Sequence, residues 1–199
     1  MLKLFNPRWY CQADIGPPAR KTIETELIEK YLKDDSNFAH PGWDCNVLTT
    51  ELSVEQEVPW DIFIAEITPH IEKLIEEIGT NCHDYTIEFV NVWANKYRKG
   101  MSQEAHTHPS RHYNLVGVYF FSLPEDSGKF LFYDETNLPY KLSGIDSVLR
   151  VQSTDTVDPE IKENEIILFP SHYIHHVTQH NTTQERLSIS FNLLLKEKC

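Results

Sequence analysis

The spacing of apolar residues changes partway along this chain, and the change restricts the folds that the chain can adopt. Apolar residues recur every three or four positions in residues 23–32 and again in residues 60–78, as they do on one face of a helix. Between Tyr85 and Trp93 the pattern instead alternates, which is typical of a strand covered mainly on one face. The sequence therefore predicts a helical first part of the chain, followed by a β-rich part.

Prolines mark where the helices begin. Pro17 and Pro18 directly precede the first helical stretch, and proline is well tolerated in the first turn of a helix. Pro69 lies within the second stretch, where it removes a backbone donor. Either this helix bends at Pro69, or a new helix begins there with Thr68 as its N-cap. The pattern leaves both alternatives open.

Several later runs have the composition of strands and are separated by short links rich in turn-forming residues. They are residues 114–123, 129–133, 147–151, 165–169 and 186–195. A series of about eight short strands favours a β-sandwich or a jelly roll. We therefore expect one mainly β, α+β domain over residues 1–199, with a mostly helical part (1–80) and a jelly-roll core (83–195), a double-stranded β-helix of the cupin-like kind.

Charge and cysteine content exclude several kinds of partner and location. The chain has 30 acidic and 18 basic residues, a formal charge of −12, and no cluster of Lys and Arg that would hold phosphates, so we do not expect nucleic acid as a partner. No apolar run reaches the ~20 residues that span a bilayer, and the first residues lack a secretion signal. Four widely spaced cysteines indicate free thiols and a cytoplasmic location. They are Cys11, Cys45, Cys82 and Cys199.

The histidines are concentrated in two short windows that together suit a metal ion. His106 and His108 are two residues apart, and on an extended segment such residues point to the same side. His175 follows the apolar run 166–170, which ends at Pro170, so a turn brings it to the start of the next strand. In a jelly roll these two regions lie across the barrel mouth from each other. Three ligands on one face leave positions of an octahedral iron open.

The remaining histidines of these windows have weaker claims to the metal. His112 is a candidate spare ligand, because it lies four residues beyond the HxH pair. For His172, His176 and His180 we favour a structural interpretation, since only one neighbour in a turn can point inward. A metal site made of His106, His108 and His175 is the resulting prediction.

Arg186 and Ser188 share one face of the last predicted strand. The guanidinium of an arginine presents a fixed fork of donors that matches a carboxylate, and the serine adds a hydroxyl donor. Eleven residues separate His175 from Arg186, enough for a loop and a return strand. The alternative is a surface arginine in an ion pair of little energetic value. Next to the three histidines, we favour a carboxylate clamp.

Taken in order, these motifs resemble the 2-oxoglutarate–Fe(II) oxygenase superfamily, and a branch of bacterial and phage members with HxH followed by Pro most of all. The resemblance covers about residues 83–195 and is carried by an ordered set of segments. They are WANKYRKG (93–100), Gln103, HTHP (106–109), GVYFF (117–121), GKFLFYD (128–134), FPS (169–171), His175 and RLSISFN (186–192).

The resemblance implies an enzyme that uses Fe(II) and 2-oxoglutarate and releases succinate and CO2 as it hydroxylates a substrate. It implies that His106, His108 and His175 hold the iron and that Arg186 and Ser188 bind the distal carboxylate of 2-oxoglutarate. Tyr119 is a further candidate for lining this pocket. Most of the superfamily has Asp where this chain has His108, so the resemblance also implies a more cationic site that prefers anions.

Two alternatives to this function remain. Gly100, His106 and His108 have the spacing of the first cupin motif, so a cupin-type metal enzyme without 2-oxoglutarate is one, although the glutamate of that motif is missing. A jelly-roll binding module without catalysis is the other. The sequence identifies no substrate: a small molecule and a protein side chain are both compatible with it. Whether the N-terminal helices form a homodimer or cover the site is also open.

Overall fold

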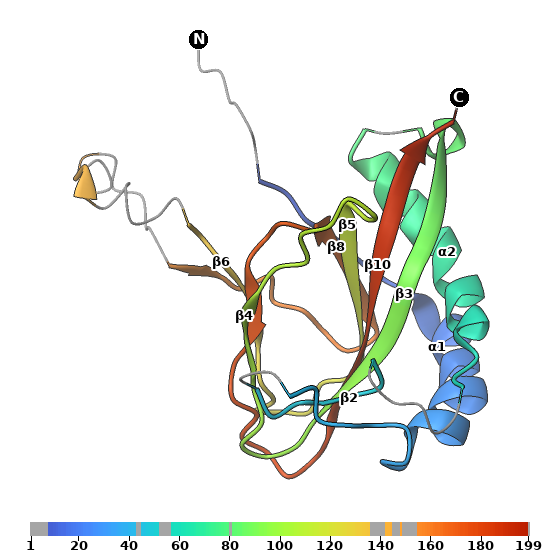
Figure 1. The fold of residues 1–199 in the computed structure, drawn as a ribbon, viewed down its shortest axis with the longest axis vertical. Coiled ribbons are helices and arrows are strands. Elements are labelled where there is room, and N and C mark those ends of the chain that lie inside the picture. Colours follow the sequence, from blue (N-terminus) through green and yellow to red (C-terminus); the bar gives the residue numbers. More distant parts are fainter. Residues whose placement is uncertain are drawn as a thin grey trace.

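The protein has three layers, formed by two antiparallel β-sheets that face each other and by helices on the outer face of the larger sheet (Figure 1). This computed structural model describes residues 8–42, 45–51, 57–79, 81–135, 142–144, 148 and 155–198. The arrangement confirms the predicted α+β, mainly β fold with a jelly-roll core. Among the described residues, no helix is long and apolar enough to cross a membrane.

The two sheets differ in size. The larger has six strands in the order β1 (Cys11–Asp14), β8 (Glu165–Pro170), β5 (Leu115–Ser122), β10 (Arg186–Glu197), β3 (Tyr85–Tyr97) and β2 (Leu48–Thr49). The smaller has four strands in the order β4 (Gln103–His106), β9 (His175–Val177), β6 (Phe130–Tyr133) and β7 (Thr156–Val157). Every pairing between these strands is antiparallel.

The predicted strands correspond closely to β3, β5, β6, β8 and β10. The sequence did not predict β1, β2 and β7, which have four residues or fewer and too little length to show a period. The strand expected at residues 147–151 falls outside the described residues, apart from Val148. In β10 the expected alternation is lost, because its first eight residues are covered on both faces and are all buried.

The helices follow the predicted apolar stretches. α1 (Gly16–Thr22) has the prolines in its first turn and continues directly into a π-helix, η1 (Ile23–Leu32). α2 (Trp60–Glu77) runs unbroken through Pro69, so the alternative of a new helix beginning there is wrong. The hydroxyl of Thr68 donates to the carbonyl of Ile64 (2.6 Å) within this helix. A short 3-10 helix, η2 (Cys82–Asp84), leads into β3.

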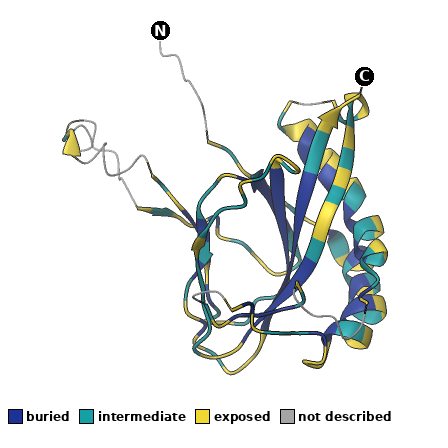
Figure 2. Ribbon diagram, in the orientation of Figure 1, coloured by how far each residue is buried: buried dark blue, intermediate teal, exposed yellow. Residues whose placement is uncertain are grey.

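Two apolar cores lie on either side of the six-stranded sheet. On β5, Leu115 and Tyr119 face the helices, whereas Val116, Val118 and Phe120 face the smaller sheet. Figure 2 shows the resulting buried surfaces along the central strands, with exposed residues on the outer sides of the helices. The N-terminal helices therefore pack on the sheet face that is turned away from the smaller sheet.

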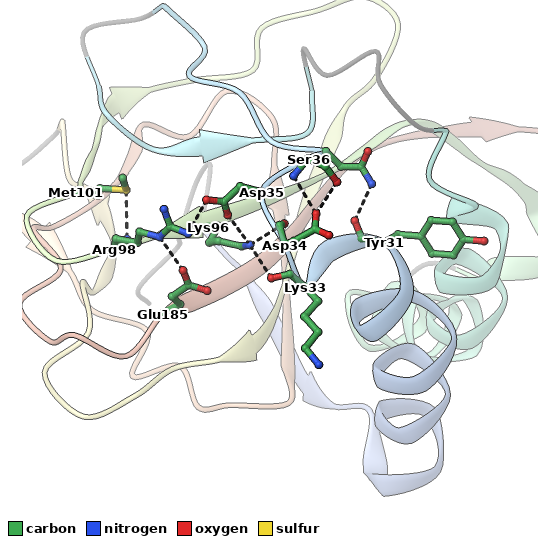
Figure 3. Close-up of polar contacts among 10 residues, drawn as sticks. Tyr31, Lys33, Asp34, Asp35, Ser36, Lys96, Arg98, Met101 and Glu185 are labelled. Carbon is green, nitrogen blue, oxygen red and sulfur yellow. Dashed lines mark hydrogen bonds and ion pairs between the residues drawn. The ribbon is translucent and has the colours of Figure 1, made fainter.

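A buried lysine fastens the end of η1 to β3 (Figure 3). Only 2% of Lys96 is exposed, and its Nζ donates to the Asp34 carbonyl (3.1 Å) and to Asp35 Oδ1 (3.0 Å). Arg98 extends this network, because it donates to Asp35 Oδ2 (2.6 Å) and to Glu185 Oε1 (2.7 Å). Glu185 directly precedes β10, so the network joins the helical layer to the start of that strand.

Candidate metal centre

The two histidine windows meet where β4 of the smaller sheet pairs with β9. His106 ends β4 and His175 begins β9, and the two residues are direct partners in the ladder. Their ring centroids lie 4.3 Å apart, and the ring of His108 lies 5.1 Å from that of His106 and 5.2 Å from that of His175. One ring nitrogen from each of the three lies within 4.8 Å of the others. This geometry allows the three imidazoles to bind one ion.

Backbone carbonyls fix the protonation of two of these rings. His106 Nδ1 lies 2.8 Å from the Glu104 carbonyl oxygen, and His175 Nδ1 lies 3.0 Å from that of Tyr173. A carbonyl oxygen only accepts hydrogen bonds, so Nδ1 carries the proton in both rings. The Nε2 lone pair of each ring is then available to a metal ion, as is common for histidine ligands.

The third ring is oriented by a pair of asparagines. His108 Nδ1 lies 2.9 Å from Asn192 Oδ1, and Asn192 Nδ2 donates to Asn91 Oδ1 (2.7 Å). The second bond sets the orientation of the Asn192 amide, so its oxygen accepts from His108. The ring of Trp93 stacks on the ring of His108, with 5.8 Å between their centroids. Nε2 is therefore the free nitrogen in this ring as well.

Burial keeps His108 and His175 neutral. It lowers the pKa of His108 to about 4, against the opposing effect of the Asn192 hydrogen bond and with a smaller contribution from His106. Burial also holds the pKa of His175 well below its usual value, assisted by the nearby His106 and His108. A neutral imidazole is the form that binds metal, so these two rings need no deprotonation at neutral pH.

Arg186 lies fully buried behind the histidines, at the start of β10. Only 1% of it is exposed, and its Nε and Nη1 have no hydrogen-bond partner among the described residues. Its guanidinium lies 4.5 Å from the ring centroid of Tyr97 and 5.6 Å from that of Phe120. A buried cation with unused donors costs free energy, and it marks a site for an anion.

Polar side chains from β3 and β10 line the space between Arg186 and the histidines. The register pairs Arg186 with Tyr97 and Ser188 with Asn95, which brings all four to one cavity of about 20 Å³. Tyr97 donates to Gln103 Oε1 (2.7 Å), and Asn95 donates to the Ser190 hydroxyl (3.1 Å). Burial raises the pKa of Tyr97 to about 12, so this phenol keeps its proton at neutral pH.

The sequence missed Asn95 and Tyr97 as site residues, although a signal was present. Both follow Trp93 at two-residue spacing, so they lie on the same face of the strand as Trp93. A register shift at Val90 places the earlier Ile87 and Phe89 on the opposite face, against the helices. A larger pocket of about 310 Å³ lies outside the cavity and shares four lining residues with it. The shared residues are Trp93, Gln103, His106 and His108.

Tyr119 does not reach this site, so its expected place in the co-substrate pocket is corrected. It lies on the opposite face of β5, where its ring packs 5.9 Å from that of Phe63 of α2. Its hydroxyl donates to Asn164 Oδ1 (3.1 Å). The physical reason is the two-residue period of a strand: Val118 and Phe120 face the site, and the residue between them cannot.

The other histidines lie outside the three-histidine cluster. His112 and His172 are exposed. The ring of His176 packs 4.7 Å from that of Tyr133. His180 is fully buried, where its Nδ1 accepts from the Gly128 amide (3.3 Å) and its Nε2 donates to the Gln184 carbonyl (2.6 Å). These placements agree with the structural interpretation, and the described part of the chain holds a single cluster of metal-ligand type.

Comparison with known proteins gives a family and a set of similar folds. Residues 91–192, just over half of the chain, match the family model described as "Putative 2OG-Fe(II) oxygenase". This stretch contains all three clustered histidines and also Arg186. No curated protein sequence matches the chain.

Several solved structures have a similar fold at low sequence identity. A prolyl-4-hydroxylase from Pseudomonas putida is 13% identical, with a TM-score of 0.61 over 96% of this chain and 94% of that one. A prolyl hydroxylase from Trichoplax adhaerens, in complex with a hypoxia inducible factor peptide fragment, is 13% identical, with a TM-score of 0.62 over 95% and 84%. HygX from Streptomyces hygroscopicus, with nickel, 2-oxoglutarate and hygromycin B bound, is 8% identical, with a TM-score of 0.59 over 94% and 82%.

Proposed function

The chain belongs to the family of 2OG-Fe(II) oxygenases, and from this premise we propose how its own residues serve the reaction. Fe(II) and 2-oxoglutarate are the cofactor and co-substrate of such an enzyme. We propose His106, His108 and His175 as the iron ligands, and Arg186 with Ser188 as the clamp for the distal carboxylate of 2-oxoglutarate. The reaction that we propose is the hydroxylation of a C–H bond in a substrate still to be identified.

The donor set fits iron. Three imidazoles converge, and in each ring the hydrogen bond at Nδ1 leaves Nε2 free. Imidazole is a ligand that suits Fe(II), and three ligands leave positions for a chelating 2-oxo acid and for O2. Because His108 supplies no negative charge, this centre is more cationic than one with Asp. Such a centre favours anionic ligands, and a dicarboxylate is one.

The single observation that carries the proposal is the unpaired guanidinium of Arg186. No described carboxylate pairs with it, and two of its nitrogens have unused donors in a buried place. The distal carboxylate of 2-oxoglutarate would supply the missing acceptors, since arginine binds carboxylates through two parallel hydrogen bonds. Ser188, two residues along β10, is 98% buried and lines the same cavity.

We further propose that Tyr97 and Asn95 contact the co-substrate, a role for which the sequence had suggested Tyr119. Tyr97 keeps its proton at neutral pH and lies against Arg186, so its hydroxyl would donate to the expected carboxylate in exchange for its bond to Gln103. Asn95 Oδ1 is buried without a partner, whereas Nδ2 bonds Ser190. With the amide reversed, Ser190 would donate to the oxygen and Nδ2 would face the cavity as a donor.

When bound, the iron supplies the activation of O2 that couples decarboxylation of 2-oxoglutarate to oxidation of the substrate. The residues of the protein bind the iron and the co-substrate and orient them. The histidines hold their lone pairs toward one point, and Arg186 fixes the far end of the co-substrate. The apolar walls of the cavity, which include Val116 and Val118, exclude water from the reacting groups.

The substrate class and the cellular location are proposed from the outer pocket, the net charge and the cysteines. The 310 Å³ outer pocket supports a small molecule or a single protein side chain as substrate. The charge of −12 supports a partner other than nucleic acid, and the dispersed cysteines support a cytoplasmic location. The helices do not lie over the centre, which leaves their outer face open to a second copy of the chain in a homodimer.

The test is spectroscopic. Fe(II) and then 2-oxoglutarate are added without oxygen, and the weak visible charge-transfer band of a chelated 2-oxo acid is followed. We expect a band in the wild type that is lost in His175→Ala and in Arg186→Met, but kept in Arg8→Met, which removes an exposed arginine. Bound iron without a band would instead favour a cupin-type enzyme that does not use 2-oxoglutarate, whereas a band that survives Arg186→Met would contradict the role of Arg186 as the carboxylate clamp.

A further inference from the structure

The outer pocket lies where a substrate would approach the metal centre, and its walls are acidic and aromatic. His106 and His108 form the part of the pocket next to the metal centre. Trp93 is among the aromatic residues that line it, and Glu51 and Glu104 supply two carboxylates. None of the described residues that line it is a lysine or an arginine. A pocket of this composition suits a ligand that carries positive charge and an apolar stem.

Glu104 is the more informative of the two acids. It lies on β4, two residues before His106, and its backbone carbonyl accepts the hydrogen bond from the His106 ring. Its side-chain Oε2 is buried and has no hydrogen-bond partner among the described residues. A carboxylate oxygen withdrawn from water without a donor costs free energy, which a bound cation would recover.

Six basic residues of the described chain form ion pairs, and none of these pairs involves Glu51 or Glu104. Arg186 lies in the inner cavity, where it has its own proposed role. The overall charge of −12 adds a long-range attraction for cations and a repulsion for anions. Within the described part of the chain, no ion pair therefore compensates the negative charge of the pocket.

We propose that the substrate presents an alkylammonium group to Glu104, with Glu51 at the rim as a second negative charge. The faces of Trp93 and Tyr113 then pack against the methylene stem, as aromatic rings do next to cations. This inference rests on the proposed function, because it places the stem beside the iron ligands His106 and His108. A C–H bond of that stem is the one that is hydroxylated. O2 is the oxidant: one of its oxygen atoms enters the C–H bond, and the other enters the succinate that forms with CO2 from 2-oxoglutarate.

The experiment uses the full chain supplied with Zn(II) and 2-oxoglutarate, and it measures binding, not turnover. The 15N-labelled protein is titrated with n-butylammonium and, separately, with n-butanol, a neutral probe of equal length. We expect saturable shifts at the Trp93 indole and at the Asn91 and Asn192 side-chain amides with the ammonium alone. Glu104→Gln should weaken its binding on the order of tenfold, as loss of a charged hydrogen bond does.

A matched variant controls for net charge. Glu88→Gln removes the same charge from an exposed position of β3 outside the pocket, and it should bind n-butylammonium as the wild type does. A peptide with one lysine, compared with the same peptide carrying norleucine, distinguishes the two sources of an alkylammonium. Tighter binding of the lysyl peptide than of n-butylammonium identifies a protein substrate, and equal binding identifies a small amine.

The outcomes separate this inference from the proposed function. Equal binding of butanol and butylammonium, absence of saturable binding, or unchanged affinity in Glu104→Gln would overturn the cationic substrate. The charge-transfer band of the iron complex does not depend on these results. Ammonium binding in a protein that shows no such band would uphold the cation pocket and overturn the proposed oxygenase site.

Discussion

At the scale of single residues, the most unusual group is the buried guanidinium of Arg186. A cation that is 1% exposed and leaves two donors unused lowers the stability of the ligand-free protein. Burial also lowers the pKa of Arg186, an effect that Tyr97 opposes. Such a residue has a physical reason to be there only if an anion binds next to it. The loss of stability that the buried guanidinium causes in the ligand-free protein can therefore be measured.

Replacing Arg186 by methionine is expected to stabilise the ligand-free protein and to abolish 2-oxoglutarate binding. Exchange of a buried ion for an apolar residue of similar length is often neutral or stabilising by about 1–4 kcal/mol. Urea unfolding without metal, together with calorimetric titration of 2-oxoglutarate in the presence of Zn(II), checks both halves. Arg98→Met is the control: its ion pairs are partly exposed, so it should gain no stability and should retain binding.

The buried histidines predict how stability depends on pH. The pKa of His108 is about 4 in the folded protein, and that of His175 is also below the unfolded value near 6.5. Between these values the unfolded chain binds more protons than the folded one. The free energy of unfolding of the metal-free protein should therefore fall as the pH drops from 6.5 towards 4. The loss is at most about 1.4 kcal/mol per pH unit for each histidine.

The measurement is denaturant unfolding with a chelator at pH 7.0, 6.0 and 5.5. His112→Gln removes an exposed histidine and should keep the slope, whereas His108→Gln should reduce it. A slope in the wild type equal to that of His108→Gln would contradict the burial of this ring as the cause.

Much of the candidate site could be predicted from residue types at fixed spacing, and the rest depended on strand phase. His106, His108, His175 and Arg186 are distinctive because few structural roles need such residues so close together. Tyr119 and Tyr97 are chemically equal candidates, and only the phase of their strands decides between them. The phase of β5 was not readable, because all of its first six residues are buried.

At the scale of elements, the pairing of β3 with β10 builds the site and its support together. On β3, Asn95 and Tyr97 face the cavity, and the residue between them, Lys96, reaches the helical layer. The alternation of one strand thus connects the co-substrate pocket to the end of η1. Sequence periodicity predicted β3 itself, but not that Lys96 would be buried, since an isolated lysine normally indicates a solvent-exposed face.

Lys96→Met should therefore destabilise the protein although it adds no volume to the core. It removes bonds to the Lys33 and Asp34 carbonyls and to Asp35, and also a contact 4.3 Å from the ring centroid of Phe38. Losing hydrogen bonds from a charged donor of this kind costs about 1.5–3 kcal/mol. Chemical denaturation compares this variant with Lys30→Met, which removes only an exposed ion pair with Glu26 and should lower the free energy of unfolding far less. Equal free energies of unfolding for the two variants would mean that the hydrogen bonds of Lys96 do not stabilise the protein.

At the scale of the whole molecule, the larger sheet lies between the helical layer and the candidate site. One face packs on the helices (Figure 1), and the other, together with the smaller sheet, encloses the cavity lined by the three histidines. The helices therefore do not cover the site, which settles one alternative that the sequence left open. The three-layer order was predictable from the change of apolar period. The closing of the smaller sheet over the site depends on pairings of β4 and β9, each too short to show a pattern.

This closure predicts that metal and co-substrate stabilise the protein cooperatively. One ligand would bridge the histidines of the smaller sheet and Arg186 of the larger sheet, so binding of 2-oxoglutarate should be stronger once the metal is present. A ligand at about 100 times its Kd adds about 2.7 kcal/mol to the free energy of unfolding. Thermal unfolding with Zn(II), with 2-oxoglutarate and with both should show a joint increase in Tm larger than the sum of the separate ones. In Arg186→Met the metal should still raise Tm while 2-oxoglutarate adds nothing, and in His175→Ala neither should act. Additive increases in the wild type would mean that the two ligands bind without contact, and that the sheets are not joined through the site.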